Sequence, residues 1–394
     1  MSSSHAPAGC HQQPVGNELD ADISELLAML AEVPDPRDPR GVQYALVYLL
    51  AVTIVAVLAG ATSIAEVTRA VSRIPQRMLS KLGAEWDWFR LRYAFPSRTT
   101  IGDILTRIDA DLLDTITGRW LMAHAWHDTD GMLVIALDGK VLRGAWTDAN
   151  NQVTLFSAML HGTGIPVAQL RVPDGTNEIT QVNTLIATIA VDPTQPRMAT
   201  LDAAHTQRET ATGLKAAGWD YLMTVKGNQP TLQTEVAAAC RPLLSQPPHH
   251  LLEEKGHGRI KRWSTWTAPA SDIDFPHLRQ VAIIRRDTFD LLRRPIAKEF
   301  ALIITSSPPE TCGPAEISTH TRGQWGIESK VHWIRDVIWD EDHNQTHTGN
   351  TAQAFAGLKN LALGLLRLKG ITTIKAAIED IASDRYRALT VMTT

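Results

Sequence analysis

The amino-acid sequence predicts an α/β protein in two parts, a helical N-terminal domain at residues 20–127 and a mixed α/β domain at residues 128–394. Residues before position 128 contain apolar side chains at helical spacing, including one long apolar run at 44–61. From Met132 the pattern changes to short apolar runs separated by turn residues, which is typical of strands. Pro-rich and strand-like segments at 230–310 then predict a β-rich insertion before the last helices.

The composition is that of an ordinary globular protein. The chain has 394 residues, of which 44% are hydrophobic and 20% charged. Its net charge of −4 gives no overall nucleic-acid-binding character, so DNA binding must depend on local basic patches. Cys10, Cys240 and Cys312 lie far apart without metal-ligand spacing, which indicates a reducing compartment. Residues 1–19 lack a secretion signal, and we expect a disordered leader and a cytoplasmic protein.

The N-terminal domain is predicted to be a helical bundle. Residues 20–32 form its first helix, and the apolar run at 44–61 is close in length to a membrane span. This run is rich in alanine, no second such run follows, and its flanking basic residues show no asymmetry. We therefore interpret it as a buried helix. Helical patterns continue at 63–82, with a break near Pro75, and at 99–121.

An aromatic and basic stretch, WDWFRLRYAFPSR, separates these last two helical patterns. Its Arg90, Arg92 and Arg98 are candidate phosphate contacts, because arginine side chains commonly position a protein on the DNA backbone. We therefore expect the helical domain to bind DNA, although no helix-turn-helix signature identifies a recognition helix.

The order of elements after Met132 predicts the type of core. The segments are strands at 134–138, 153–162 and 165–173, a helix at 178–190, a strand at 198–202, a helix at 206–217 and a strand at 221–227. A ribonuclease-H-like core has this order of elements, namely three strands, a helix, a strand, a helix and a strand, and its first and fourth strands carry acids. Helices at 316–335 and 351–368 and a short amphipathic helix in the tail complete the chain.

Three acids in this core are candidate metal ligands. Asp138 and Asp202 each follow an apolar run, although Asp-Gly at 138–139 is also a common turn. Acids at the ends of neighbouring strands would lie close together, and Glu328 lies inside the helical pattern at 316–335. Carboxylates suit Mg²⁺, with Mn²⁺ as a substitute. Two such ions about 3.5–4 Å apart can cut and join DNA phosphodiesters.

Glu328, His332 and Asp336 are spaced at i, i+4 and i+8, so a regular helix would present them on one face. Such a face suits a metal site with a phosphate-contacting flank, and it equally suits a solvated helix surface. Trp325 and Trp333 are expected to pack on the other side of the helix, as part of the core.

Several stretches resemble a known family. The segments IALDGKVLRG, LDAAHTQRETA, YLMTVKGNQPTL, EKGHGRIKR and RGQWGIESKVHWIRDVIWDEDH resemble motifs of the H-repeat-associated proteins, a branch of bacterial insertion-sequence transposases of the DDE type. VPDPRDPRGVQYALVYLLAVTIVAVLAGATSIAE and FPSRTTIGDIL resemble the helical domain that precedes their catalytic core. The resemblance runs from about Leu26 to Arg367. Around the last acid the sequence departs from the family at Gln324, Ser329 and Lys330, where the family usually has His, Asn and a small residue.

The resemblance implies a ribonuclease-H-like core and magnesium-dependent strand cleavage and strand transfer, with Asp138, Asp202 and Glu328 as the catalytic and metal-binding acids. It implies double-stranded DNA as partner, both the terminal inverted repeats and the target, and a homodimer in the DNA complex. We expect no membrane association and a nucleoid-associated protein. Two alternatives stay open: a nuclease with the same core and no strand transfer, and an inactive DNA-binding remnant.

Further residues are candidate DNA contacts, each with the alternative that it is an ordinary surface or core residue. Lys140 and Arg143 follow the first acid, His205 and Gln207 follow the second, and Lys226 and Asn228 end the fifth strand. In the insertion, a basic hairpin offers His257, Arg259, Lys261 and Arg262 beside Trp263 and Trp266, which suits a distorted DNA end or a flipped base if the tryptophans are not buried. Arg322, His332 and Arg335 in the last catalytic helix complete the set.

Overall fold

A computed structural model describes residues 21–125, 131–147, 151–345 and 349–393. The predicted leader at 1–19 and the predicted domain boundary at 127 and 128 lie outside these residues. Before the boundary, the described chain forms helices α1 (Ser24–Ala31), η2 (Pro39–Gly41), α2 (Leu46–Leu58), α3 (Ile64–Val71), α4 (Gln76–Lys81), α5 (Arg98–Arg107) and α6 (Ala110–Ala125), and a small hairpin of β1 (Trp86–Asp87) and β2 (Arg92–Tyr93).

Helix α2 contains the long apolar run and is buried, as predicted. Every residue from Leu46 to Leu58 except Val47 is buried. It packs against α1, α3 and α12 (Thr351–Leu368). In the ranges that the structure describes, none of the helices combines the length and apolar character needed to cross a membrane.

The predicted helix at 99–121 is two helices. Ile108 has an extended backbone after α5, and the Asp109 carboxylate then accepts a hydrogen bond from the backbone N–H of Leu112 at 3.0 Å. This is the bond made by a side chain that caps a helix, so Asp109 starts α6 as a new helix. The sequence signal for the break was Asp109, which lies within an otherwise continuous helical pattern.

The centre of the molecule is one mixed sheet of nine strands in the order β5-β4-β3-β6-β7-β11-β10-β9-β8. The strands are β3 (Leu133–Trp146), β4 (Gln152–Leu160), β5 (Pro166–Arg171), β6 (Arg197–Leu201), β7 (Asp220–Val225), β8 (His250–Gly256), β9 (Arg259–Pro269), β10 (Gln280–Asp290) and β11 (Pro295–Thr305). β3 runs parallel to β6, and β6 parallel to β7, while the other pairs are antiparallel. The five strands predicted from the sequence are therefore confirmed as β3 to β7.

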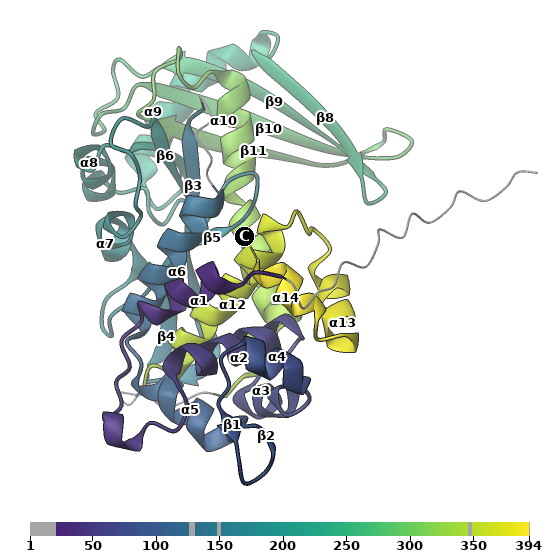
Figure 1. Ribbon diagram of the computed structural model, residues 1–394. Helices are drawn as coiled ribbons and strands as arrows, with labels where there is room; N and C mark the ends of the chain where they lie inside the picture. Colours follow the sequence, from purple (N-terminus) through teal and green to yellow (C-terminus); the bar gives the residue numbers. More distant parts are fainter. Residues whose placement is uncertain (1–20, 126–130, 148–150, 346–348, 394) are drawn as a thin grey trace, which may run out of the picture.

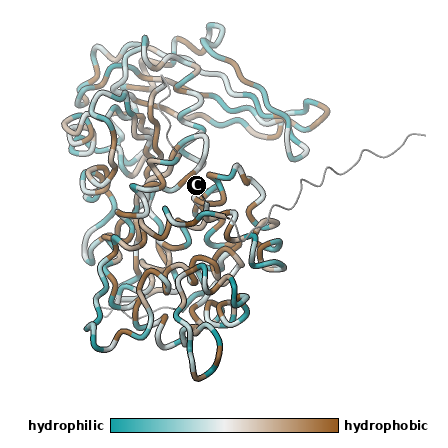
Figure 2. The backbone as a smooth tube through the Cα atoms, viewed as in Figure 1, coloured by the Kyte–Doolittle hydropathy of each residue, from teal (hydrophilic) through white to brown (hydrophobic). Residues whose placement is uncertain are grey.

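The β-rich insertion extends this sheet. It begins with helix α9 (Pro230–Cys240), which the Pro-rich sequence concealed, because proline at the first position of a helix is well tolerated. Strands β8 to β11 follow, and β11 pairs with β7, so the insertion adds four strands to the same ladder of hydrogen bonds. In Figure 1 these strands project to one side of the molecule, and in Figure 2 their outer parts are mostly hydrophilic.

The remaining helices lie between and after the strands. They are η3 (Glu178–Gln181), α7 (Val182–Ala187), α8 (Arg208–Ala216), η4 (Arg241–Ser245), α10 (Pro314–Gln324), the π-helical turn η5 (Glu328–His332), α11 (Trp333–Val337), η6 (Glu341–His343), α12, α13 (Ile374–Ser383) and α14 (Arg387–Met392). The predicted helix at 316–335 is therefore interrupted by a π turn, and the predicted tail helix is two helices.

Helix α12 joins the two parts of the chain. It packs against α2, α5 and α6 of the N-terminal helices and against β5 of the sheet. Figure 1 shows it among the N-terminal helices, although it comes near the end of the sequence. One continuous hydrophobic core contains residues of α1 to α6, of the sheet and of α12. The N-terminal helices and the sheet are therefore held against each other by shared apolar packing.

Candidate functional site

Asp138 and Asp202 come from neighbouring parallel strands. The last paired residues of β3 and β6 are Ala136 and Thr200, and each acid lies two residues further on. Neighbouring strands are separated by about 4.8 Å, and residues two apart point to the same face, so equal register places the two side chains beside each other. Asp138 is largely buried and Asp202 is partly exposed. The Asp202 carboxylate accepts a hydrogen bond from the backbone N–H of Ala204 at 3.0 Å.

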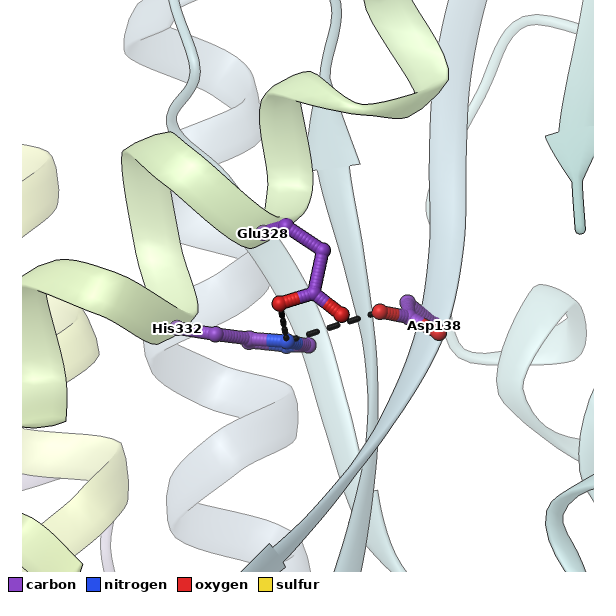
Figure 3. Close-up of side chains that lie close together, drawn as sticks. All are labelled: Asp138, Glu328 and His332. Carbon is purple, nitrogen blue, oxygen red and sulfur yellow. Dashed lines mark ion pairs between the residues drawn. The ribbon is translucent and has the colours of Figure 1, made fainter.

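The π turn η5 brings Glu328 and His332 to Asp138. His332 Nδ1 lies 3.5 Å from Asp138 Oδ2 and 3.7 Å from Glu328 Oε2. One ligand atom from each of the three residues lies within 4.8 Å of the others. Figure 3 shows the Glu328 carboxylate pointing toward Asp138, with the His332 ring beneath both. π turns of this kind are frequent at functional sites.

The three acids share a cavity of about 670 Å³. Its lining residues come from β3, β7, β8, β9, β10 and β11, from the two residues directly after β6, and from residues 321–328 of α10 and η5. The charged lining residues are Asp138, Asp202, Lys226, Glu254, Lys261, Arg286, Glu299, Arg322 and Glu328. The structure thus brings together the three acids predicted from the sequence.

Electrostatics at these acids favour an added positive charge. Burial raises the pKa of Asp138 strongly, and the nearby Glu328 and Asp202 carboxylates raise it further. The adjacent imidazole of His332 lowers the pKa of Glu328, whereas burial lowers the pKa of His332. Without a cation, burial and the neighbouring carboxylates therefore favour the protonated form of Asp138.

The family models decide the relationship of this chain to known proteins. A model described as a transposase DDE domain matches residues 129–365, which is more than half of the chain. A second model, described as DDE_Tnp_1-associated, matches residues 27–121. The chain belongs to the DDE transposase family.

Individual relatives agree with this family. "H repeat-associated putative transposase YhhI" of Escherichia coli K12 is 26% identical over 88% of this chain and 91% of its own length. "Putative transposase YncI" of E. coli O157:H7 is 26% identical over 88% of each chain. The resemblance to H-repeat-associated transposases is thereby confirmed. Among solved structures, "Cryo-EM structure of piggyBac transposase synaptic complex with hairpin DNA (SNHP)" aligns with 95% of this chain and 80% of its own, at 12% identity and a TM-score of 0.43.

Of the basic residues predicted to contact DNA, Lys226, Lys261 and Arg322 line the cavity with the acids. Lys226 and Lys261 are exposed. Arg322 lies over the ring of Trp263 at 4.4 Å and forms an ion pair with Glu254. Because these basic side chains and the acids line the same cavity, one DNA strand could contact both through its phosphates.

The basic hairpin forms as predicted, with its turn at His257 and Gly258 between β8 and β9. His257 and Arg259 are exposed at this turn, whereas Arg262 is paired with Glu253 at 2.9 Å. Trp263 and Trp266 are buried, with 8% and 2% of their surface exposed. The sequence left open whether these tryptophans are exposed or buried, and the structure shows that they are buried. Both rings pack within the sheet that carries the hairpin, and Trp263 also lines the cavity.

Four of the residues predicted to contact DNA are buried, and they are Arg335, Lys140, His205 and His332. Arg335 is fully buried and forms an ion pair with Glu341 at 2.7 Å. Lys140 is 7% exposed, pairs with Asp336 and lies 3.6 Å from Asp342. His205 is 1% exposed and stacks on Phe156. The sequence could not show this burial, because Asp336 and Asp342, which pair with Lys140, and Gln169, which accepts a hydrogen bond from Arg335, are distant in sequence.

The other predicted residues have mixed positions. Arg143 is exposed and lies 3.4 Å from Asp342. Asn228 is exposed and donates a hydrogen bond to the backbone oxygen of Ala203 at 2.7 Å, while Gln207 accepts one from Gln229. His332 is 4% exposed and faces the acids, so it has no surface from which to contact DNA.

Two tryptophans of the last catalytic segment contradict the prediction that they belong to the core. Trp325 is 67% exposed and lines the cavity, and Trp333 is 54% exposed. A π turn has a wider hydrogen-bonding step than an α-helix, so residues after it point in directions that regular helical spacing does not predict. Trp333 follows directly after the π turn.

The residues that anchor the segment carrying Glu328 are not among those predicted from the sequence. Gln324, four residues before Glu328, is buried and donates a hydrogen bond from Nε2 to the backbone oxygen of Leu137 at 3.0 Å. Its Oε1 accepts a hydrogen bond from the Thr200 hydroxyl. The four-residue spacing between Gln324 and Glu328 could have indicated that both side chains face the acids. In the sequence, however, Gln324 stands out only as a departure from the family pattern.

Proposed function

We propose that the chain is a DNA transposase of an insertion sequence, which binds the element ends and catalyses strand cleavage and strand transfer by transesterification. One observation carries this proposal. Asp138, Asp202 and Glu328, which are far apart in the sequence, line one cavity in a chain of the DDE transposase family. We assign these three residues as the catalytic acids.

The proposed core is ribonuclease-H-like and comprises β3 to β7 with the helices that connect them. The strand order β5-β4-β3-β6-β7, with only β3, β6 and β7 parallel, supports this assignment. We keep the proposed domains at 20–127 for the helical region and 128–394 for the catalytic region, with the insertion at 230–310. The leader at 1–19 lies outside the described residues.

We propose that the acids hold Mg²⁺, with Mn²⁺ as a substitute. The residues fit such a group, because carboxylate oxygens are the ligands that Mg²⁺ prefers, and the largely buried Asp138 carboxylate is repelled by Glu328 and Asp202 until a cation is added. When bound, divalent metal supplies an activated oxygen nucleophile and stabilises the leaving oxygen. The chain's own residues hold the scissile phosphate in place: Lys226, Lys261 and Arg322 line the cavity beside the acids.

The helical region is proposed to hold DNA through the β1–β2 hairpin. Trp88 is 79% exposed and Phe89 is completely exposed. Residues 73–98 contain six arginines and lysines and two acids, in a chain whose net charge is −4. Exposed aromatic side chains flanked by arginines are suited to bind DNA. The arginines are attracted to the phosphates, and the apolar side chains can insert between base steps in the groove.

Transposition joins both ends of an element to a target, so we propose that two copies of the chain act together on double-stranded DNA, one at each terminal inverted repeat. The experiment incubates the full chain with Mg²⁺, a labelled duplex that contains the element end, and a target plasmid. Nicks at the end followed by joined molecules support the proposal. Hydrolysed ends without joined molecules would assign a nuclease, and bound but uncut DNA would assign an inactive remnant.

A further inference from the structure

The imidazole of His332 is buried against two of the proposed acids. The residue is 4% exposed, and its Nδ1 lies 3.5 Å from Asp138 Oδ2 and 3.7 Å from Glu328 Oε2. Its other ring nitrogen, Nε2, is buried without a hydrogen-bond partner. Figure 3 shows the ring edge with Nδ1 directed at the space between the two carboxylates. A buried polar side chain with one nitrogen unpartnered needs a physical reason to stay there.

Hydrogen bonding alone is a weak reason. A normal N–H···O hydrogen bond has a donor–acceptor distance of about 2.9–3.0 Å, and both distances from Nδ1 are longer. Core packing alone is weak too, since an apolar residue would fill the same space without burying two ring nitrogens.

The three ligand atoms suit one shared ion instead. Metal ions bind imidazole nitrogen and carboxylate oxygen at about 2.0–2.2 Å, so two ligands of one ion can lie roughly 3–4.4 Å apart. The distances from Nδ1 to the two carboxylates fall in this interval. The third distance, between carboxylate oxygens of Asp138 and Glu328, also requires no large movement of the side chains, since all three ligand atoms lie within 4.8 Å of one another.

The backbone also supports this arrangement. Glu328 and His332 are the first and last residues of the π turn, and both side chains point toward β3. Val331 and Ile334, which lie close to His332 in sequence, are buried and hold the turn against the core. The imidazole is therefore held in one place, as a ligand on a rigid support must be.

We infer that His332 Nδ1 is a metal ligand, so that the ion held by Asp138 and Glu328 has a mixed nitrogen and oxygen coordination. This inference rests on the proposed function only for the presence of a metal. Its consequence concerns which metal binds. Imidazole suits transition metals, whereas Mg²⁺ strongly prefers oxygen. The site should therefore bind Mn²⁺ more tightly than Mg²⁺, and by a wider margin than three carboxylates would give.

The test measures Mn²⁺ bound to the full chain without DNA, by electron paramagnetic resonance. Electron spin-echo modulation reports directly on a nitrogen bonded to Mn²⁺. We expect ¹⁴N modulation in the wild-type chain, and its replacement by ¹⁵N frequencies when the histidines are labelled with ¹⁵N. We expect Glu or Asp ligands alone to give no such signal.

The variant His332→Gln keeps a hydrogen-bond donor and removes the imidazole. We expect it to lose the nitrogen modulation and to bind Mn²⁺ about tenfold or more weakly, with a smaller change for Mg²⁺ measured by competition. His343→Gln is the matched control, because His343 is exposed and lies outside the cluster, and it should retain both properties.

Absence of nitrogen modulation from the wild-type chain with Mn²⁺ bound would overturn the inference, whether or not the variant folds. Retention of the modulation in a folded His332→Gln protein would overturn it as well. DNA cleavage is scored separately: a chain that nicks DNA without nitrogen modulation refutes only the ligand role, and a chain with modulation that produces no nicks refutes only the proposed function.

Discussion

Gln324 Nε2 donates a hydrogen bond across 3.0 Å to the backbone oxygen of Leu137, the residue immediately before Asp138. The same Gln324 side chain accepts a hydrogen bond from Thr200, two residues before Asp202. One buried amide thus joins the segment that carries Glu328 to both strands that carry the other acids. The relative positions of the three acids depend on this bridge.

Removing the bridge should therefore affect both stability and activity. In Gln324→Ala, the Leu137 oxygen loses this buried donor, whereas the Thr200 hydroxyl keeps its contacts with the Ile135 oxygen at 3.1 Å and with His161 at 2.9 Å. The free energy of unfolding should therefore fall by about 0.5–1.5 kcal/mol, the usual net contribution of a hydrogen bond. Nicking should fall further than the remaining folded fraction explains, because Glu328 loses its anchor. Urea unfolding and a nicking assay measure the two effects. Gln246→Ala, at an exposed glutamine, is the control and should change neither.

The three acids should be individually required for chemistry. We expect Asp138→Asn, Asp202→Asn and Glu328→Gln each to reduce nicking by at least about 100-fold, since even outer partners of metal ligands account for about 10–100-fold. Binding of the element end, measured by gel mobility shift, should persist. Asp272→Asn, at an exposed acid outside the cavity, should leave nicking unchanged. Intact cleavage in all three variants would show that the assignment of the acids is wrong.

The buried ion pair between Arg335 and Glu341, with Lys359 beside it at 3.3 Å, should make the protein sensitive to acid. Burial alone would raise the pKa of Glu341, but Arg335 and Lys359 outweigh it and lower this pKa to about 2. An acid whose pKa is lower in the folded than in the unfolded chain stabilises the fold at pH values above its unfolded pKa, which is 4.5 for Glu341. This stabilisation is lost as the pH falls toward the folded pKa of about 2.

We therefore expect the melting temperature to fall steeply as the pH decreases from about 4.5 to about 2. In Glu341→Gln, which leaves two buried cations without their acid, the free energy of unfolding at pH 7 should drop by about 3–5 kcal/mol, and this acid sensitivity should be smaller. Thermal melts across the pH range test both statements. Glu310→Gln, at an exposed glutamate, should behave like the wild type. Equal acid sensitivity in both variants would refute the role of Glu341.

The β1–β2 hairpin should matter for DNA and little for folding. The double substitution Trp88→Ser and Phe89→Ser changes two exposed side chains, so stability should shift by no more than about 0.5 kcal/mol. Affinity for the element end should fall about tenfold or more, as expected when aromatic contacts with bases are lost. Fluorescence anisotropy measures this loss. Leu292→Ser, at an exposed leucine of the β10–β11 turn, should retain full affinity.

The sequence predicted the elements that carry the acids because local patterns determine them. Apolar runs that end in an acid located β3 and β6, and their parallel pairing then places Asp138 and Asp202 in equal register. Helical periodicity likewise located α2 and α12. These features need no knowledge of distant residues.

The misplaced residues depend on the tertiary structure. Lys140 is buried because Asp336 and Asp342, about 200 residues later, supply its counter-charges. Arg335 is buried because Glu341 supplies its counter-charge and the side-chain oxygens of Gln169 and Asn360, which are distant in sequence, accept hydrogen bonds from it. Trp333 is exposed because a π turn, which spacing alone does not reveal, precedes it.

The insertion strands and the acid-bearing strands belong to a single ladder of backbone hydrogen bonds, from β5 to β8. The projecting hairpins are joined to the acid-bearing strands where residues 302–305 of β11 pair with β7, so the connection is made by backbone hydrogen bonds within the sheet. DNA held by these hairpins would be presented to the acids at a constant angle. The duplex itself, by bending or unpairing, would then have to absorb the deformation that brings a phosphodiester to the acids.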